Sequence, residues 1–217
     1  MKGLLRNNFY ATESSIKATV LTSFIGIIAI TIGGLLYPLN NTIMTIVVSG
    51  ILGGFGALAG TAVQKDVNCK WSKFELTMPV SRKDVVSARY FSFFIYIMLG
   101  VFMAILSVFL FYLVSDSIKL ERVGYSFTFG IAFAFSIPTF LYPLVLIFGS
   151  DKNETLLLIA IFLGVGLFFG SSVLTSPFLQ SFEHSNLIFR ISYMIASIGL
   201  FVLSYIFSLF YYSKKEL

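Results

Sequence analysis

Charged side chains are scarce in this chain of 217 residues, because Asp, Glu, Lys and Arg together make up only 12% of it. Soluble domains contain about 25% charged residues. Hydrophobic residues make up 57% of the chain, and its mean hydropathy is +0.91. This balance excludes a water-soluble fold and indicates an integral membrane protein.

Cysteine, histidine and tryptophan each occur once, as Cys69, His184 and Trp71. A single cysteine cannot form an intramolecular disulfide. A single histidine without other clustered ligands does not indicate a metal site, so we predict neither a metal nor a bound cofactor. The sequence also lacks a phosphate-binding G-x-x-x-x-G-K-[ST] loop and any Gly-Lys dipeptide, so we do not predict that this chain is an ATPase.

Long apolar runs are what the sequence does contain. A helix that crosses a hydrocarbon core of about 30 Å needs roughly 20 apolar residues. Six runs reach that length, so the predicted fold class is an all-α integral membrane protein with six transmembrane helices in a single transmembrane domain, residues 1–217. The predicted spans are residues 18–38, 42–63, 91–114, 125–148, 155–175 and 187–211.

Residues 1–17 are not apolar enough to span. Leu5, Phe9, Thr12 and Ile16 recur at helical spacing with charged residues around them, which predicts an amphipathic helix along the cytoplasmic interface. A secretory signal peptide is the competing interpretation. It is disfavoured because the apolar run is too long for a signal sequence and no A-x-A-like cleavage site ends it.

The distribution of basic residues predicts the orientation. Twelve of the 15 Lys and Arg residues lie before the first span or after the second, fourth and sixth spans. Since cytoplasmic loops carry an excess of Lys and Arg, we expect both termini and residues 64–90 to be cytoplasmic. Basic residues scattered in short segments between apolar runs suit a membrane face, and we do not expect nucleic acid as a partner.

No Asp, Glu, Lys, Arg or His lies in the middle of any predicted span, and Arg190, in the first turn of the last span, is the one such residue within a span. Ion-coupled transporters and intramembrane proteases need such groups at mid-membrane. Secondary transport is disfavoured further because no internal repeat is visible. Energy for any transport should therefore come from outside the bilayer.

The segment between the second and third spans has the clearest pattern outside the spans. Trp71, Phe74 and Met78 lie at positions i, i+3 and i+7, which predicts a short amphipathic helix. Pro79 ends that helix, and Ser81 begins a new one, with an acidic residue three positions later as in a capping box. A basic loop with an interfacial Trp anchor is the simpler interpretation; a docking helix for a soluble partner is the functional one.

This segment resembles the ABC-2 type permeases of bacterial drug, bacteriocin and peptide exporters. In that family an aromatic-rich stretch precedes a [ST]-[LM]-P-[VI]-[ST]-R-like elbow and a helix that often ends in [KR]-Y. The six spans and the cytoplasmic termini extend the resemblance over nearly the whole chain. The residues that carry it are Trp71, Phe74, Thr77, Met78, Pro79, Val80, Ser81, Arg82, Val85, Arg89 and Tyr90.

The resemblance implies the partners. Two permease chains, identical or homologous, would form the pathway in the bacterial cytoplasmic membrane, and each would dock on a separate ATPase subunit that binds ATP and Mg²⁺. Residues 149–154 would form a second, smaller contact with that subunit. The residues implied in coupling are Trp71, Phe74, Glu75, Met78, Pro79 and Arg82.

The resemblance also implies a cargo. Small size and Phe-rich, charge-poor spans are similar to exporters of antimicrobial or cytolytic amphipathic peptides, such as phenol-soluble modulins and bacteriocins. Efflux of drugs or lipids is the alternative within the family. A membrane immunity protein that binds a toxin without transporting it is the alternative outside it.

Three further features are candidates for packing or movement. Small residues spaced for close helix packing, Gly53, Ala57, Gly56 and Gly60, predict contact either within the chain or with a second permease. Pro138 and Pro143 predict a kinked fourth span, as a hinge or as tolerated prolines that Ser136 and Thr139 satisfy. Phe178 and Phe182 fit an aromatic belt, or, by resemblance, an outer gate in residues 176–186.

Overall fold

The computed structural model describes residues 2–36, 41–68, 81–114, 120–149, 152–179 and 185–214. In these ranges it contains six long helices and no strand, which confirms the predicted fold class. All six are long and apolar enough to cross a membrane. The helices are α1 (Lys2–Leu36), α2 (Asn41–Asn68), α4 (Arg82–Val114), α5 (Leu120–Phe148), α6 (Asn153–Leu179) and α7 (Ser185–Lys214).

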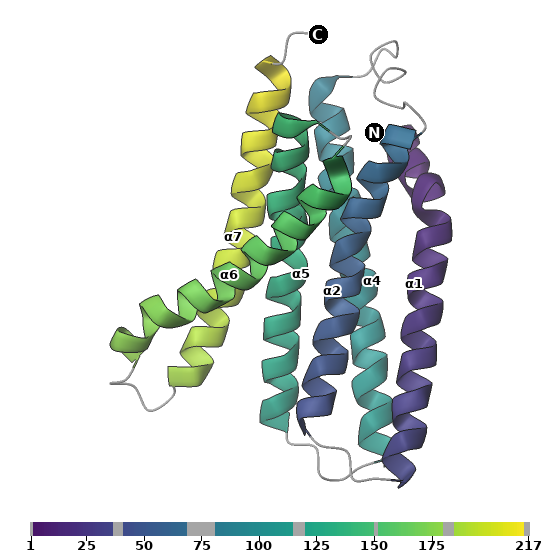
Figure 1. Cartoon of the computed structure of the whole chain (residues 1–217), viewed down its shortest axis with the longest axis vertical. Helices are drawn as coiled ribbons and strands as arrows, with labels where there is room; N and C mark the ends of the chain where they lie inside the picture. The colour runs from purple at the N-terminus through teal and green to yellow at the C-terminus, as the bar shows by residue number, and fades with distance from the viewer. Residues whose placement is uncertain are drawn as a thin grey trace.

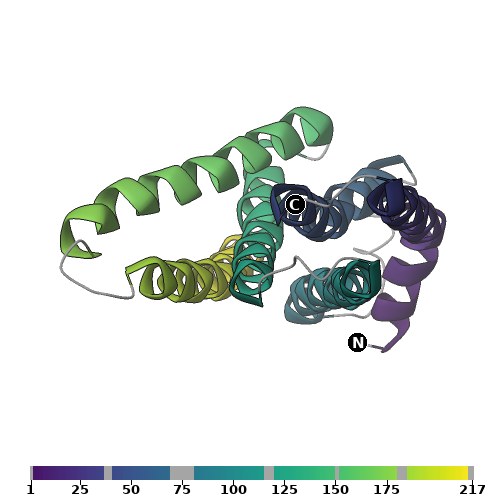
Figure 2. The same cartoon turned by 90° about the horizontal axis from the view of Figure 1, so that it is seen from below.

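The helices run alternately up and down, so that α1 begins and α7 ends at the same end of the bundle (Figure 1). We call this the basic end, because Arg6, Lys65, Arg82, Lys152 and Lys214 all lie within about two turns of the helix ends that meet there. Helices α2 and α5 are central, with α1 and α4 on one side and α6 and α7 on the other (Figure 2). Helix α6 diverges from α5 with distance from the basic end (Figure 1).

Helix α1 includes described residues of both the predicted N-terminal helix and the predicted first span. It runs without interruption over 35 residues, from Lys2 to Leu36. At about 1.5 Å per residue it is about 52 Å long and exceeds the hydrocarbon thickness. Leu4, Asn8 and Thr12, spaced by four, are buried beside α4, because the two polar side chains find hydrogen-bond partners there. An interfacial location for residues 1–17 stays a prediction.

Two helix ends are defined by local chemistry, and the sequence predicts the first of them. Ser81 caps α4: its Oγ accepts a hydrogen bond from the Asp84 amide at 3.1 Å, as the S-x-x-D pattern indicates. Gly149 follows α5 with a φ of 87°, and its amide donates to the Val145 carbonyl at 3.0 Å. Glycine adopts this left-handed conformation without a steric penalty, so it can end the helix here.

The close contact between α2 and α5 depends on Gly56. A Cβ atom at this position would lie 2.8 Å from the carbonyl oxygen of Ala134. Gly53 and Gly60 likewise lie against side chains of this chain, Phe133 of α5 and Leu157 of α6. Ala57 is half-buried. Packing within the chain therefore accounts for all three of these glycines.

We predict that Gly56→Ala destabilises the protein and that Gly54→Ala does not. The new methyl group at position 56 meets backbone, and overpacking of this kind costs about 1–3 kcal/mol. Gly54 is the matched control, because a Cβ there meets nothing within 4 Å. Thermal unfolding of both variants in the same detergent measures the difference, and equal midpoints would contradict this packing.

Candidate functional site

Polar contacts between helices concentrate on the first four turns of α4, immediately after residues 69–80. We call this group the α4 hub; it comprises Arg82, Ser87, Arg89, Tyr90, Ser92 and Tyr96. These side chains contact α1, α2 and α7. Whatever displaces the start of α4 therefore acts directly on three other helices.

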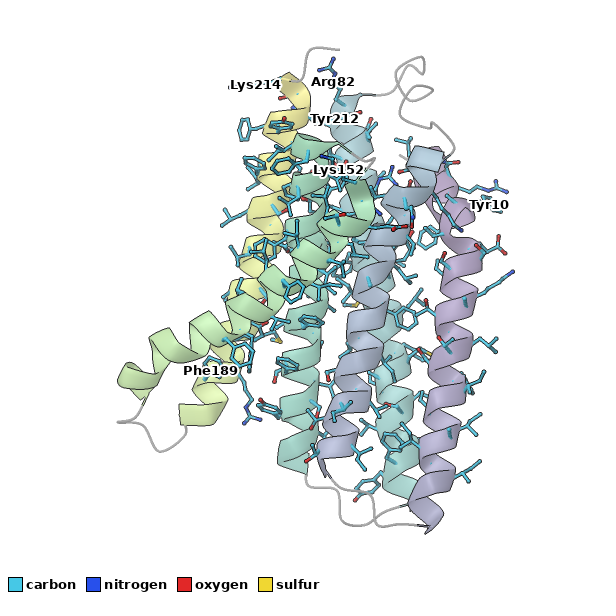
Figure 3. The ribbon with its side chains drawn as sticks, in the orientation of Figure 1. Tyr10, Arg82, Lys152, Phe189, Tyr212 and Lys214 are labelled. Atoms are coloured by element: carbon cyan, nitrogen blue, oxygen red, sulfur yellow. The ribbon has the colours of Figure 1, made fainter. Side chains whose placement is uncertain are left out.

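Arg82 connects the start of α4 to the end of α7. Its Nη1 donates to the carbonyl oxygens of Ser213 at 3.1 Å and Tyr212 at 3.4 Å. Figure 3 shows Arg82, Tyr212 and Lys214 together at the basic end. The last carbonyls of a helix lack helical donors and carry partial negative charge, so a guanidinium group stabilises them.

Arg89 forms a buried ion pair with Asp66 of α2. The side chains are only 7% and 16% exposed, respectively. The distribution of basic residues places Arg89 in the predicted cytoplasmic segment 64–90, whereas in the structure its side chain is buried between helices. Sequence analysis missed this pair, although opposite charges just outside two predicted spans are the signal that could have found it.

Asn8 and Thr12 attach α1 to the hub. The Asn8 Nδ2 donates to the Ser92 Oγ at 3.1 Å. The Thr12 hydroxyl donates to the Asn8 carbonyl at 2.8 Å, so the fully buried Tyr96 donates its hydroxyl hydrogen to the Thr12 Oγ1, also at 2.8 Å. The ring of Phe9 packs edge-on against Tyr96 at 5.7 Å.

Tyr90 belongs to a hydroxyl chain that satisfies a backbone carbonyl next to a proline. Pro143 has no amide hydrogen, so the carbonyl of Thr139 lacks its helical donor. The Ser204 hydroxyl of α7 donates to that carbonyl at 2.7 Å. Because each hydroxyl has one hydrogen, Tyr90 must then donate to Ser204 at 2.6 Å and accept from Ser208 at 2.9 Å.

This arrangement corrects the prediction that Ser136 and Thr139 satisfy the carbonyls beside the prolines. Both hydroxyls instead donate at 2.7 Å within their own helix, to the carbonyls of Phe133 and Phe135. A short hydroxyl side chain on a helix reaches back only to the preceding turn, so the donor comes from another helix. Helix α5 continues through both Pro138 and Pro143.

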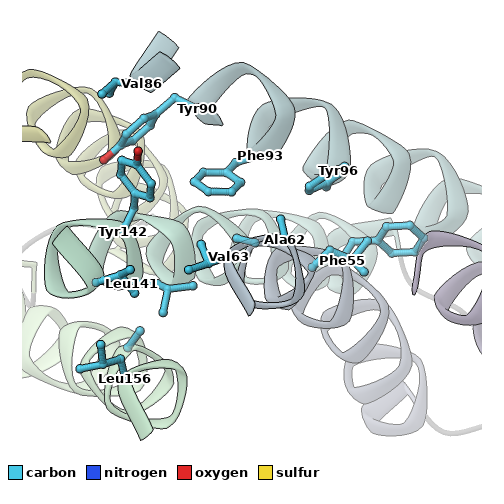
Figure 4. Packing of buried hydrophobic residues seen from close by; sticks show 14 of the residues in the cluster. Phe55, Ala62, Val63, Val86, Tyr90, Phe93, Tyr96, Leu141, Tyr142 and Leu156 are labelled. Carbon is cyan, nitrogen blue, oxygen red and sulfur yellow. The ribbon is translucent and has the colours of Figure 1, made fainter. Parts of the chain in front are cut away.

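Aromatic rings surround the Tyr90 hydroxyl chain. Figure 4 shows Tyr90 facing Tyr142, and these two rings meet edge to face at 5.4 Å. Phe93, Phe201 and Tyr205 also contact the ring of Tyr90, at centroid distances of 5.9, 5.2 and 5.3 Å. The hydroxyl groups are therefore enclosed by protein, where an unmet hydrogen bond would be costly.

The start of α6 is held against α2 at the same end. The Asn153 Nδ2 donates to the carbonyl of Gly60 at 2.9 Å, and the Gln64 Nε2 donates to the Glu154 carboxylate at 2.8 Å. Lys152 and Glu154 remain exposed. Within the predicted second contact, residues 149–154, Asn153 and Glu154 thus adjoin the same helix as Asp66.

The other predicted site residues stand as follows. Arg82 is in the hub, and the two prolines are inside α5. Phe178 lies in the range of α6, with its side chain outside the described ones. In the described part of the chain, no three His, Cys, Asp or Glu side chains form a group that could hold a metal ion. Residues outside the described ranges are Trp71, Phe74, Glu75, Met78, Pro79 and Phe182.

We predict that Ser204→Ala lowers stability, whereas Ser192→Ala on the same helix does not. Ser204 supplies the donor for the Thr139 carbonyl, while Ser192 is exposed and bonds only within its own helix. Interhelical hydrogen bonds in membranes contribute about 0.6 kcal/mol on average and up to about 1.7 kcal/mol. Thermal unfolding in detergent measures both variants; the hydroxyl chain would be refuted by identical midpoints for wild type and Ser204→Ala.

Comparison with known proteins agrees with this architecture. The family model described as "ABC-2 family transporter protein" matches residues 3–213, which is nearly the whole chain. No curated protein and no solved structure matches. The six described helices and this match together show that the chain belongs to the ABC-2 family and is a membrane-spanning component of an ABC transporter.

Proposed function

We propose that this chain is the permease subunit of an ATP-driven exporter in the bacterial cytoplasmic membrane, with antimicrobial or cytolytic amphipathic peptides as cargo. It pairs with a second permease chain, identical or homologous, and with ATPase subunits that bind ATP and Mg²⁺. One observation carries the proposal: in an ABC-2 chain, the interhelical polar contacts converge on the residues that directly follow segment 69–80.

The charge distribution supports a cytoplasmic basic end. Arg6, Lys65, Arg82, Lys152 and Lys214 all lie near the helix ends that meet there. The positive-inside rule favours the cytoplasm for such an end. In this orientation both termini, segment 69–80 and residues 149–154 face the compartment that supplies ATP.

Segment 69–80 is the proposed docking element for the ATPase. Trp71 and Phe74 would be its apolar anchors, because aromatic side chains contribute much of the energy of compact interfaces. Glu75 and Met78 would complete the contact, and Pro79 would end the docking helix before α4 begins. Arg82 follows directly and links this element to α7. ATP-driven closure of the ATPase subunits would then displace α4 and the helices bound to its hub.

The aromatic contacts farther from the basic end support an amphipathic cargo. The half of the bundle away from the basic end is rich in aromatic contacts, such as Phe129–Phe168 at 4.7 Å and Phe168–Tyr193 at 5.3 Å. Arg190 lies over the ring of Tyr125 at 5.6 Å. Phe178 and Phe182 would extend this aromatic region as an outer gate. Apolar and amphipathic molecules suit such a surface better than ions do.

We predict that a soluble ATPase co-purifies with the intact chain in mild detergent and is lost from Trp71→Ala with Phe74→Ala. Truncation of interface aromatics of this kind costs about 2 kcal/mol or more of binding energy. The matched control is Phe102→Ala with Phe109→Ala, which removes two exposed aromatic side chains of α4 at mid-helix. If no ATPase accompanies the wild-type chain, the permease assignment to an ATP-driven exporter is wrong.

Cargo class is tested by uptake into inside-out vesicles that contain the complex. We expect ATP-dependent accumulation of a fluorescent, 20-residue amphipathic helical peptide, and none with a non-hydrolysable ATP analogue. Preferential uptake of a lipophilic dye or a labelled lipid would favour drug or lipid efflux instead. Peptide binding that is insensitive to nucleotide would favour a passive immunity protein.

A further inference from the structure

Asp66 and Arg89 form a buried ion pair, and in the sequence they flank the proposed docking element, residues 69–80. Asp66 is two residues before the end of α2, and Arg89 is in the second turn of α4. Residues 69–80 connect these two helices in the sequence. The pair therefore joins α2, which precedes the docking element in the sequence, to α4, which follows it.

Stability alone does not explain two buried charges at this position. The desolvation of two buried charges can cost as much free energy as their attraction gains. Apolar side chains of similar volume at the same positions therefore often make a protein equally stable or more stable. Helices α2 and α4 already pack tightly through apolar groups. A Cβ at Gly100 of α4 would lie 2.8 Å from the Cβ of Phe55 of α2, and Phe55 is fully buried.

What the ion pair adds is a fixed relation between the two helix ends. The apolar contacts set the distance between the two helices at Gly100 and Phe55, whereas the charges act at the helix ends, where separated charges in a poorly solvated environment attract strongly and are costly to leave unpaired. The Asp66–Arg89 pair therefore resists relative sliding and rotation of α2 and α4 at the point where the docking element is attached.

Helix α1 is connected to the same unit. The Lys65 Nζ donates to the Ser14 Oγ at 2.6 Å, one residue before Asp66, and the Tyr96 hydroxyl binds Thr12. At the basic end, α1, α2 and α4 are thus joined pairwise by polar contacts. A displacement of either end of segment 69–80 acts on all three helices together.

We propose that Asp66 and Arg89 are positioning residues for energy coupling: their ion pair makes α2 and α4 move as one body when the ATPase displaces segment 69–80. This inference rests on the proposed function and deepens it, because it specifies how motion passes from the docking element into the spans. The pair acts through the two helices and needs no contact with cargo or nucleotide.

The experiment replaces the pair in two ways in the full complex. The variant Asp66→Leu with Arg89→Met keeps apolar contact without charge, and Asp66→Arg with Arg89→Asp reverses the charges. The control variant Glu13→Leu with Lys17→Met removes an ion pair that, unlike Asp66–Arg89, lies within one helix and is exposed, with side chains 50% and 74% accessible. ATPase co-purification, ATP hydrolysis, thermal unfolding and uptake of the fluorescent amphipathic peptide are measured for each.

We expect the apolar pair to unfold at the wild-type temperature, to bind the ATPase and to hydrolyse ATP, but to transport at least about fivefold less peptide per ATP, a typical lower bound for coupling between sites. The reversed pair should recover most of the wild-type amount of peptide transported per ATP, and the Glu13→Leu with Lys17→Met control should transport as much peptide per ATP as the wild type. Wild-type peptide transport per ATP in the apolar variant would overturn the inference.

Loss of folding in the apolar variant, with recovery in the reversed pair, would also overturn it, because the charges would then serve stability. Failure of the wild-type chain to bind an ATPase or to transport peptide is a different result. It would overturn the proposed function itself, before either pair variant is compared.

Discussion

A polar group inside a bilayer has only the protein as a hydrogen-bond partner, and this constraint organises the structure. Pro143 shows its effect, because the Thr139 carbonyl that loses its helical donor is bound by Ser204 from a different helix. That hydrogen bond joins α7 to α5, and Tyr90 connects both of these helices to α4. Neutral hydroxyl groups provide the hydrogen-bond partners here, and the buried Asp66 and Arg89 provide them for each other.

Polar contacts between helices are concentrated in one half of the bundle. Near the basic end, hydrogen bonds and the buried ion pair cross-link the described parts of the six helices, and α4 takes part in most of these contacts. Aromatic rings contact one another in both halves, around Tyr90 near the basic end and around Phe168 farther from it, where α6 diverges from α5 (Figure 1). This concentration of polar cross-links suits a protein in which motion starts at the basic end.

Local features of the fold were predictable because they depend on short stretches of sequence. Length and hydropathy define the six helices, and the Ser81 cap follows from one pattern of four residues. Contacts between helices were not predictable in the same way. Periodicity identifies which face of α1 is apolar, but it does not indicate that Asn8 and Thr12 find partners on α4. The pairing of Asp66 with Arg89 likewise depends on how two helices are placed, which local patterns leave open.

The central claim, that segment 69–80 docks on an ATPase, can be tested through the only cysteine of the chain, Cys69. A photoreactive maleimide on Cys69 in native membranes should cross-link to a protein that contains a G-x-x-x-x-G-K-[ST] loop, with a yield that changes on addition of ATP. The same reagent on Thr42→Cys in a Cys69→Ser background, at the opposite end of α2, should give no such product. Cross-linking of Cys69 to lipid alone, with no ATPase product in either nucleotide state, would contradict the account.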